Sequence, residues 1–189
     1  WIDYKTIIDN EKIDSLYHFT DRENLESIIQ TGGLYSWADC EAKGIAIPKP
    51  GGSDTSRSLD CKAKLQNYVR VSFVEHHPMM YVAMNEGRIP NPVILKIDPK
   101  VIWSEGTKYS DRNAVRNVVN VGSELDDFKK IHFSTVKAKK HFDVEEEEQP
   151  YYQAEVLVKN FIPLDCITNI GNFGIPIPSQ PKQIQAKVP

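Results

Sequence analysis

Residues 151–158 read Tyr-Tyr-Gln-Ala-Glu-Val-Leu-Val, and this stretch does most to decide the fold. From residue 154 to residue 158 it is apolar apart from one glutamate, which predicts a strand. Alternation along a strand places Gln153 and Glu155 on one face and the apolar side chains on the other. An ionised glutamate in mid-strand is costly to bury without a partner, so Glu155 either faces solvent or serves a functional site. The pattern favours a Glu155 that points into a cleft beside Gln153.

Other strands are predicted on both sides of this stretch. Residues 68–73 alternate between apolar and polar types, and residues 92–98 read as a buried strand. Residues 166–170 are a further strong strand candidate, and residues 101–103 a weaker one. Residues 38–58 combine prolines and glycines with serine and aspartate, which indicates a loop.

The helices are expected mainly in the first half of the chain. Residues 19–33 form one, because Thr20 and Glu23 fit a capping box ahead of an apolar stripe that ends at glycine. Residues 78–87 form another, which begins with proline and ends with glycine. A short helix capped by aspartate is expected over residues 111–119. Helices early and strands later predict an α+β fold rather than a doubly wound sheet.

Length and composition limit the class of protein. The chain has 189 residues, of which 40% are hydrophobic and 26% charged, enough for one soluble domain with a core. We expect a domain over residues 1–170 and a proline-rich tail over residues 171–189. The sequence has no apolar run of membrane-spanning length and no visible signal peptide, so we expect a cytoplasmic protein without a membrane partner.

Metal binding is not expected. The three cysteines, Cys40, Cys61 and Cys166, form no Cys-x-x-Cys pair, which makes a zinc or redox site improbable. His76 and His77 are adjacent, and neighbouring residues of an extended chain point to opposite sides. A structural role for these two histidines is the stronger hypothesis.

Charge is unevenly distributed between residues 129 and 148. The whole chain has 23 Lys and Arg against 26 Asp and Glu, a net charge of -3. Residues 129–142 nevertheless hold five Lys, two His and two Phe with no acid, and residues 143–148 are almost entirely acidic. A charge run is usually only a solvated face. Basic residues interleaved with aromatic ones also suit a nucleic-acid backbone and its stacked bases.

Several motifs in order resemble one known family. They are Tyr17-His18-Phe19-Thr20, the helix beginning Asn24-Leu25, Arg57, Tyr68-Val69, His77-Pro78-Met79-Met80-Tyr81, Tyr109-Ser-Asp-Arg-Asn-Ala114 and Gln153-Ala154-Glu155-Val-Leu-Val158. Together, over residues 16–170, they resemble the DarT family of toxins. These toxins belong to toxin–antitoxin systems and ADP-ribosylate DNA bases using NAD. The resemblance implies a single-domain ADP-ribosyltransferase-like fold with a central split β-sheet and flanking helices.

The resemblance implies roles for residues of the reaction centre. Glu155 would be the catalytic residue, since a carboxylate on a ribose hydroxyl stabilises the positive charge that develops as nicotinamide leaves. Arg57 would meet the pyrophosphate or approach the reaction centre. The implied NAD-binding residues are His18, Thr20, Tyr68 and Tyr81, although His18 alone reads more simply as a core histidine, and both tyrosines as core aromatics. NAD would be consumed as a substrate by this glycosyltransferase (mono-ADP-ribosyltransferase), with no metal required.

The same resemblance implies a DNA surface and partners. The implied DNA contacts are Lys137, Lys139, Lys140, Phe133, Phe142, Arg112 and Asn113. Single-stranded DNA is expected because chemistry on a base requires an unstacked base. Residues 70–73 and 76–77 differ from the thymidine-modifying members, which favours guanine over thymine. We also expect a bacterial monomer with an antitoxin that is an ADP-ribosyl hydrolase, such as a macrodomain or NADAR protein. The alternatives are an ADP-ribosyltransferase acting on protein or RNA, and a catalytically inactive nucleic-acid-binding module.

Overall fold

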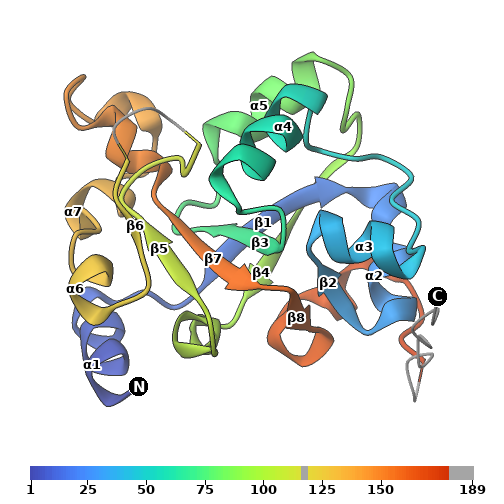
Figure 1. Ribbon diagram of the computed structural model, residues 1–189, viewed down its shortest axis with the longest axis horizontal. Coiled ribbons are helices and arrows are strands. Elements are labelled where there is room, and N and C mark those ends of the chain that lie inside the picture. The colour runs from blue at the N-terminus through green and yellow to red at the C-terminus, as the bar shows by residue number, and fades with distance from the viewer. Residues whose placement is uncertain (116–118, 179–189) are drawn as a thin grey trace.

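A six-stranded antiparallel sheet with the strand order β4-β1-β3-β7-β5-β6 organises the protein (Figure 1). The computed structural model describes residues 1–115 and 119–178. A separate two-stranded sheet pairs β2 with β8. The strands are β1 (Leu16–Asp21), β2 (Gly33–Tyr35), β3 (Tyr68–Ser72), β4 (Pro92–Ile97), β5 (Lys108–Ser110), β6 (Val121–Gly122), β7 (Glu155–Lys159) and β8 (Phe161–Pro163).

Short helices cover the sheet and connect its strands. In Figure 1, α4 and α5 lie above the sheet, while α1, α6 and α7 gather at its β6 end. The α-helices are α1 (Ile2–Glu11), α2 (Leu25–Thr31), α3 (Trp37–Lys43), α4 (Asp54–Ala63), α5 (Pro78–Asn85), α6 (Leu125–Phe128) and α7 (Phe133–Val136). The 3-10 helices are η1 (Arg22–Asn24), η2 (Pro99–Trp103), η3 (His141–Asp143), η4 (Gln149–Gln153), η5 (Leu164–Cys166) and η6 (Ile170–Phe173). No helix among the described residues is long and apolar enough to cross a membrane.

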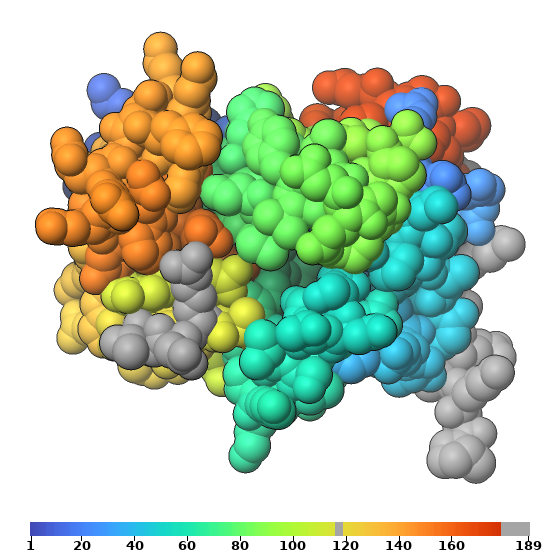
Figure 2. All heavy atoms as spheres, turned by 90° about the horizontal axis from the view of Figure 1, so that it is seen from above, coloured from blue at the N-terminus to red at the C-terminus, as the bar shows by residue number. Residues whose placement is uncertain are grey.

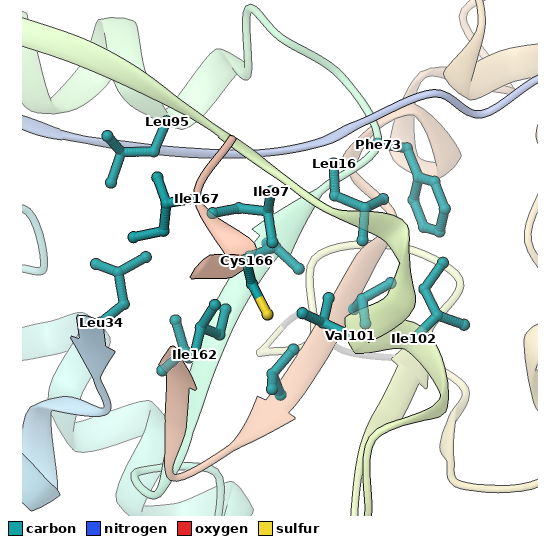
Figure 3. Packing of buried hydrophobic residues seen from close by; sticks show 14 of the residues in the cluster. Leu16, Leu34, Phe73, Leu95, Ile97, Val101, Ile102, Ile162, Cys166 and Ile167 are labelled. Atoms are coloured by element: carbon teal, nitrogen blue, oxygen red, sulfur yellow. The ribbon is translucent and has the colours of Figure 1, made fainter. Parts of the chain in front are cut away.

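The core lies against the face of the sheet opposite the helices α4 and α5. Leu16, Ile97 and Ile162 are completely buried and come from β1, β4 and β8. Figure 3 shows them converging with the buried thiol of Cys166. Burial of these apolar side chains is the main stabilising contribution to the fold. It also fixes β1, β3 and β7 side by side, and these three strands carry the candidate site.

Three of the predicted strands and one predicted helix are confirmed. β3, β4 and β7 form where alternation and apolar runs predicted strands, and α5 begins at Pro78 as expected. Helix α2 ends at Gly32, whose φ of 85° is in the left-handed region that favours glycine. The α+β class is also confirmed.

The predicted start of the helix over residues 19–33 was wrong, because α2 begins only at Leu25. β1 continues through Asp21 because it pairs with β4 along its whole length. Asp21 caps the following turn by accepting a hydrogen bond from the Glu23 backbone N–H at 2.9 Å. Thr20 instead accepts a hydrogen bond from the Asn24 side chain, also at 2.9 Å. Strand pairing therefore overrode the capping signal.

The predicted loop over residues 38–58 was also wrong in part. It contains most of α3 and the start of α4, and residues 44–53 connect them. Ser36 and Ser53 cap these helices by accepting hydrogen bonds from the backbone N–H groups of Asp39 and Ser56. Serine, which suggested a loop, here begins helices.

Three smaller predictions failed as well. Residues 101–103 belong to η2. Residues 166 and 170 belong to η5 and η6, and between them Ile167 forms an isolated bridge to Ile97 of β4. Residues 111–115 are not helical, and residues 116–118 lie outside the described residues. Asp111 is held by Asn120, which donates to it from both its backbone and its side chain. The aspartate thus closes a loop rather than capping a helix.

The predicted tail begins as part of the packed structure. Phe173 and Ile175 are partly buried and pack against the core. Residues 179–189 of that segment lie outside the described residues.

Candidate active site

A cavity of about 470 Å³ opens above the strands β1, β3 and β7. Its walls come from these strands, from α3 and α4, and from the segment that enters α5. Figure 2 looks onto this side and shows a hollow between α5, in green, and α4, in teal. Of the residues predicted from the sequence, the cavity brings together His18, Thr20, Arg57, Tyr68, Asn113 and Glu155.

Glu155 opens β7 and is 6% exposed. Its backbone lies between Ser72 of β3 and Ser110 of β5 in the register of the sheet. Its Oε2 accepts two hydrogen bonds, from Arg70 Nη1 at 2.6 Å and from the Ala114 backbone N–H at 2.9 Å. Both described hydrogen bonds of this carboxylate are on Oε2. Oε1 is therefore the oxygen left for a molecule in the cavity.

Arg70 joins two carboxylates across the cavity wall. Its Nη2 donates to Asp60 of α4, and its Nη1 to Glu155. Burial opposes the charge on Arg70, yet the Glu155 and Asp60 carboxylates raise its pKa overall. Burial likewise raises the pKa of Asp60, although Arg70 acts in the opposite direction.

Sequence reasoning missed both Arg70 and Asp60 as site residues. A signal existed for Arg70, since an arginine in the middle of an alternating strand raises the same question as Glu155. Asp60 had no such signal, because it is one of several polar residues on α4.

His18 is linked to Arg70 by a hydrogen bond to the backbone of β3. Its Nδ1 donates to the Arg70 carbonyl at 2.8 Å, because a carbonyl oxygen only accepts. Burial lowers the pKa of His18, against the opposing effect of this hydrogen bond. The ring is therefore neutral at pH 7, and its Nε2 is an acceptor in the cavity wall.

Asn24 fixes the rim of the cavity, although the sequence indicated it only as part of a family motif. Asn24 donates to Thr20 Oγ1 at 2.9 Å and to the Lys49 carbonyl at 2.7 Å. The Lys49 backbone N–H donates back to Asn24 Oδ1 at 2.9 Å. Asn24 thus holds the connection between α3 and α4 against β1.

The remaining predicted NAD residues differ in placement. The Arg57 guanidinium lies over the Trp37 ring, 5.5 Å from its centroid, and Arg57 lines the cavity. Tyr68 also lines the cavity, and Lys108 lies over its ring. Tyr81, by contrast, is 46% exposed on α5 and does not line the cavity. The structure gives no support for Tyr81 as a wall of the nicotinamide pocket.

Some predicted DNA contacts are already engaged elsewhere. Phe133 packs in the core against Phe73 and Phe128, so stacking on a base is not its role. Lys137 forms an ion pair with Glu11 at 2.6 Å. Core packing, which the sequence does not reveal, corrects the prediction for Phe133, whereas Lys137 is exposed and its DNA contact stays a prediction.

Arg112 is also engaged, and Asn113 lies at the cavity. The Arg112 guanidinium pairs with Asp111 and lies over the Tyr151 ring, 4.4 Å from its centroid. Tyr151 in turn stacks on His132 with centroids 3.7 Å apart. Asn113 lines the cavity and accepts a hydrogen bond from the Val115 backbone N–H.

Lys139, Lys140 and Phe142 remain exposed, and Phe142 is 88% exposed. The neighbouring His141 lies close to His77, which lines the cavity. Burial, the Arg70 guanidinium and the His141 ring together lower the pKa of His77 to about 4. The exposed basic and aromatic residues therefore include the direct sequence neighbours of His141, whose charge acts on His77 at the cavity.

His77 has a structural role in α5. Its Nδ1 accepts a hydrogen bond from the Met79 backbone N–H at 3.2 Å and so caps the helix. Within residues 1–115 and 119–178, no group of three or more His, Cys, Asp or Glu side chains is placed to hold a metal ion.

The antiparallel sheet of this α+β domain brings His18, Arg70 and the buried Glu155 to one cavity. This arrangement is typical of an ADP-ribosyltransferase that uses NAD. The sequence model of the DarT family, described as an ssDNA thymidine ADP-ribosyltransferase, matches residues 17–175. The chain therefore belongs to the DarT family.

Similar proteins agree with this assignment. A DNA ADP-ribosyl transferase of Thermus aquaticus is 26% identical over 188 residues, covering 92% of this chain and 82% of that protein. The structure of Thermus sp. 2.9 DarT in complex with ADP-ribosylated ssDNA has a TM-score of 0.68 at 18% identity, with 85% of each chain covered. The structure of the same DarT with NAD+ has a TM-score of 0.60 at 20% identity, covering 85% of this chain and 86% of that one.

A further likeness is to a longer protein. Thermosipho africanus DarTG in complex with ADP-ribose has a TM-score of 0.66 at 23% identity. The match covers 82% of this chain and 42% of that chain. These structures confirm the predicted ADP-ribosyltransferase-like fold.

Proposed function

We propose that this protein transfers ADP-ribose from NAD to a base in single-stranded DNA. The observation that carries the proposal is the position of the Glu155 carboxylate at the wall of the cavity. Both of its described hydrogen bonds are accepted by Oε2, which leaves Oε1 for a substrate. A carboxylate in that position is what the reaction requires next to the ribose of NAD.

In the proposed reaction, the bond between the ribose C1′ and nicotinamide breaks, and nicotinamide leaves with the bonding electrons. Positive charge then develops on the ribose, and Glu155 stabilises it through a hydrogen bond to a ribose hydroxyl. A base nitrogen attacks C1′, and Glu155 is proposed to take up the proton that this nitrogen loses. Neutral His18 and positively charged Arg57 are proposed to hold the NAD, with Thr20 and Tyr68 beside them.

The proposed DNA surface consists of Lys139, Lys140 and Phe142. Lysines neutralise phosphates, while an exposed aromatic ring stacks on an unpaired base. Asn113, at the cavity itself, is proposed to approach the target base. The small basic surface suits modest and salt-sensitive binding, with selectivity left to the cavity.

Guanine is the proposed target rather than thymine. The support is that Arg70 and His77, both in segments that differ from the thymidine-modifying pattern, line the cavity. Thymine is the competing target, since the family description names thymidine.

The proposed biological setting is that of a bacterial, cytoplasmic toxin that acts as a monomer. Its partner would be an antitoxin with ADP-ribosyl hydrolase activity, of the macrodomain or NADAR kind. The support is the family resemblance together with the likeness to Thermosipho africanus DarTG.

The deciding experiment incubates the protein with NAD and four single-stranded oligonucleotides, each lacking a different base. We expect a mass gain of one ADP-ribose on every oligonucleotide except the one without guanine. Glu155→Ala should lower the rate by about a hundredfold or more. Loss of product only from the oligonucleotide without thymine would replace guanine with thymine. Modified protein or RNA and unmodified DNA would overturn the proposal, as would DNA binding without any turnover.

A further inference from the structure

Three charged side chains form a continuous chain of contacts beside the cavity. They are Asp60 on α4, Arg70 on the next element, β3, and Glu155 on β7, which lies 85 residues further along the chain than Arg70. The side chains of Asp60 and Glu155 are 9% and 8% exposed, and that of Arg70 is 24% exposed. Charges this well buried require partners, so the three groups depend on one another.

The two ends of the Arg70 guanidinium serve different carboxylates. Nη1 donates to Glu155 and Nη2 to Asp60. A planar guanidinium that is held at both ends has a fixed orientation. Asp60 therefore determines how Arg70 presents Nη1 to Glu155.

The direction of the Glu155 carboxylate follows from the same contacts. Arg70 and the Ala114 backbone N–H both bind Oε2 from the protein side. Two donors on one oxygen fix the plane of the carboxylate and leave the other oxygen to the substrate. A carboxylate that is already oriented needs no rearrangement when charge develops on the ribose.

We infer that Arg70 is a positioning residue for Glu155, and that Asp60 contributes to the reaction only through Arg70. The inference rests on the proposed function, because it assigns both residues to the same transfer reaction. It differs from the alternative in which Asp60, which also lines the cavity, acts on the substrate directly.

The test is a double-mutant cycle with Asp60→Asn, Arg70→Met and the variant that carries both changes. The measured quantities are kcat for ADP-ribose transfer to single-stranded DNA and Kd for NAD. We expect Arg70→Met to lower kcat about a hundredfold, the effect of a misplaced reacting group. Asp60→Asn should lower kcat about tenfold, since it weakens the hold on Arg70 without removing it. Kd for NAD should change little in either variant.

The double variant decides between the two roles of Asp60. If Asp60 acts only through Arg70, the double variant is no slower than Arg70→Met. If the two losses multiply, Asp60 acts on the substrate by itself and the inference is overturned. Wild-type kcat in Arg70→Met would overturn it as well.

Folding is controlled with two further variants. Arg70→Met leaves two carboxylates without their partner, whereas Arg70→Lys keeps the charge and should recover part of kcat. Arg22→Met removes an arginine that contacts the Phe173 carbonyl away from the cavity, and should leave kcat unchanged. A loss of kcat in Arg70→Met that Arg70→Lys does not relieve, with Kd for NAD lost too, would indicate a structural role only. Absence of transfer by the wild-type protein would reject the proposed function, which is a different outcome.

Discussion

At the scale of single residues, the titratable groups with the clearest consequences are two buried histidines. The pKa of His77 is about 4, lowered by burial, by Arg70 and by His141, and burial also lowers the pKa of His18. The folded protein keeps both rings neutral at pH values where the unfolded chain takes up protons. Both histidines therefore stabilise the folded state less as the pH falls below about 6.5.

Acidification should accordingly destabilise the fold before most carboxylates titrate. His77 alone should lower the free energy of unfolding by about 2 kcal/mol between pH 7.5 and pH 5, because each unit between the unfolded and folded pKa counts about 1.4 kcal/mol. Urea unfolding at the two pH values measures this change. His77→Asn, which retains a capping side chain, should lose most of it. His76→Gln, at the exposed neighbouring position, should behave as wild type. Equal pH dependence in His77→Asn would contradict the assignment to His77.

Single residues could be predicted from the sequence where they break a pattern. Glu155 is visible because it is an acid in an apolar strand, and its burial beside Arg70 explains why it is tolerated there. Asp60 breaks no pattern, since its helix is largely polar. Phe133 shows the opposite error, because an aromatic residue among lysines resembles a stacking residue although it packs in the core.

At the scale of elements, the lysines of residues 129–142 fall into two sets, one in ion pairs with α6 and one exposed beside η3. Lys129 and Lys130 pair with Asp126 and Asp127 on and beside α6. Lys139 and Lys140 directly precede η3 and are exposed. The two lysine pairs therefore differ in their surroundings although they carry the same charge.

This difference predicts different effects on DNA binding. Changing Lys139 and Lys140 to glutamine should weaken binding of single-stranded DNA and reduce the salt slope of log K by about 1.4, or about 0.7 for each lost phosphate contact. Phe142→Ala should cost about 1–3 kcal/mol of binding free energy at every salt concentration if it stacks on one base.

Fluorescence anisotropy with a labelled oligonucleotide at several salt concentrations measures both effects. The control changes Lys129 and Lys130 to glutamine, which removes the same charge and should alter the slope far less. Equal slopes for the two double variants would show that only total charge matters.

Elements could be predicted where hydrophobic periodicity is regular, and their length did not decide this, since neither of the ten-residue helices α1 and α4 was predicted. β3 and β7 show alternation over several residues, and both are confirmed. Helices α3 and α4 were hidden because their serine caps and polar faces resemble loop composition. Residues 19–21 of β1 were assigned to a helix because the pairing of β1 with β4 is a tertiary contact that local sequence does not contain.

At the scale of the whole molecule, the cavity joins parts of the chain that are otherwise separate. Its walls combine β1, β3 and β7 with α3 and α4. A ligand that fills this cavity would contact three of the six strands and both helices at once. Binding to the folded state alone raises the stability of the entire domain.

NAD should therefore protect the protein against thermal unfolding. At a concentration about 100 times its Kd, NAD should add about 2.7 kcal/mol to the free energy of unfolding and raise Tm by several degrees. Differential scanning fluorimetry measures the shift. Arg57→Met should reduce the shift at a given NAD concentration, whereas Arg22→Met should not. No shift at any NAD concentration would contradict NAD binding by this cavity.

The place of β7 in the sheet has a consequence for the order in which the protein becomes active during synthesis. β7 lies between β3 and β5, yet it follows both in the chain (Figure 1). A nascent chain that ends before residue 155 lacks both Glu155 and the strand that joins the two halves of the sheet. Pairings between distant segments also form late in folding. Catalytic competence should thus arise only after the ribosome has released β7, which keeps partial translation products inactive.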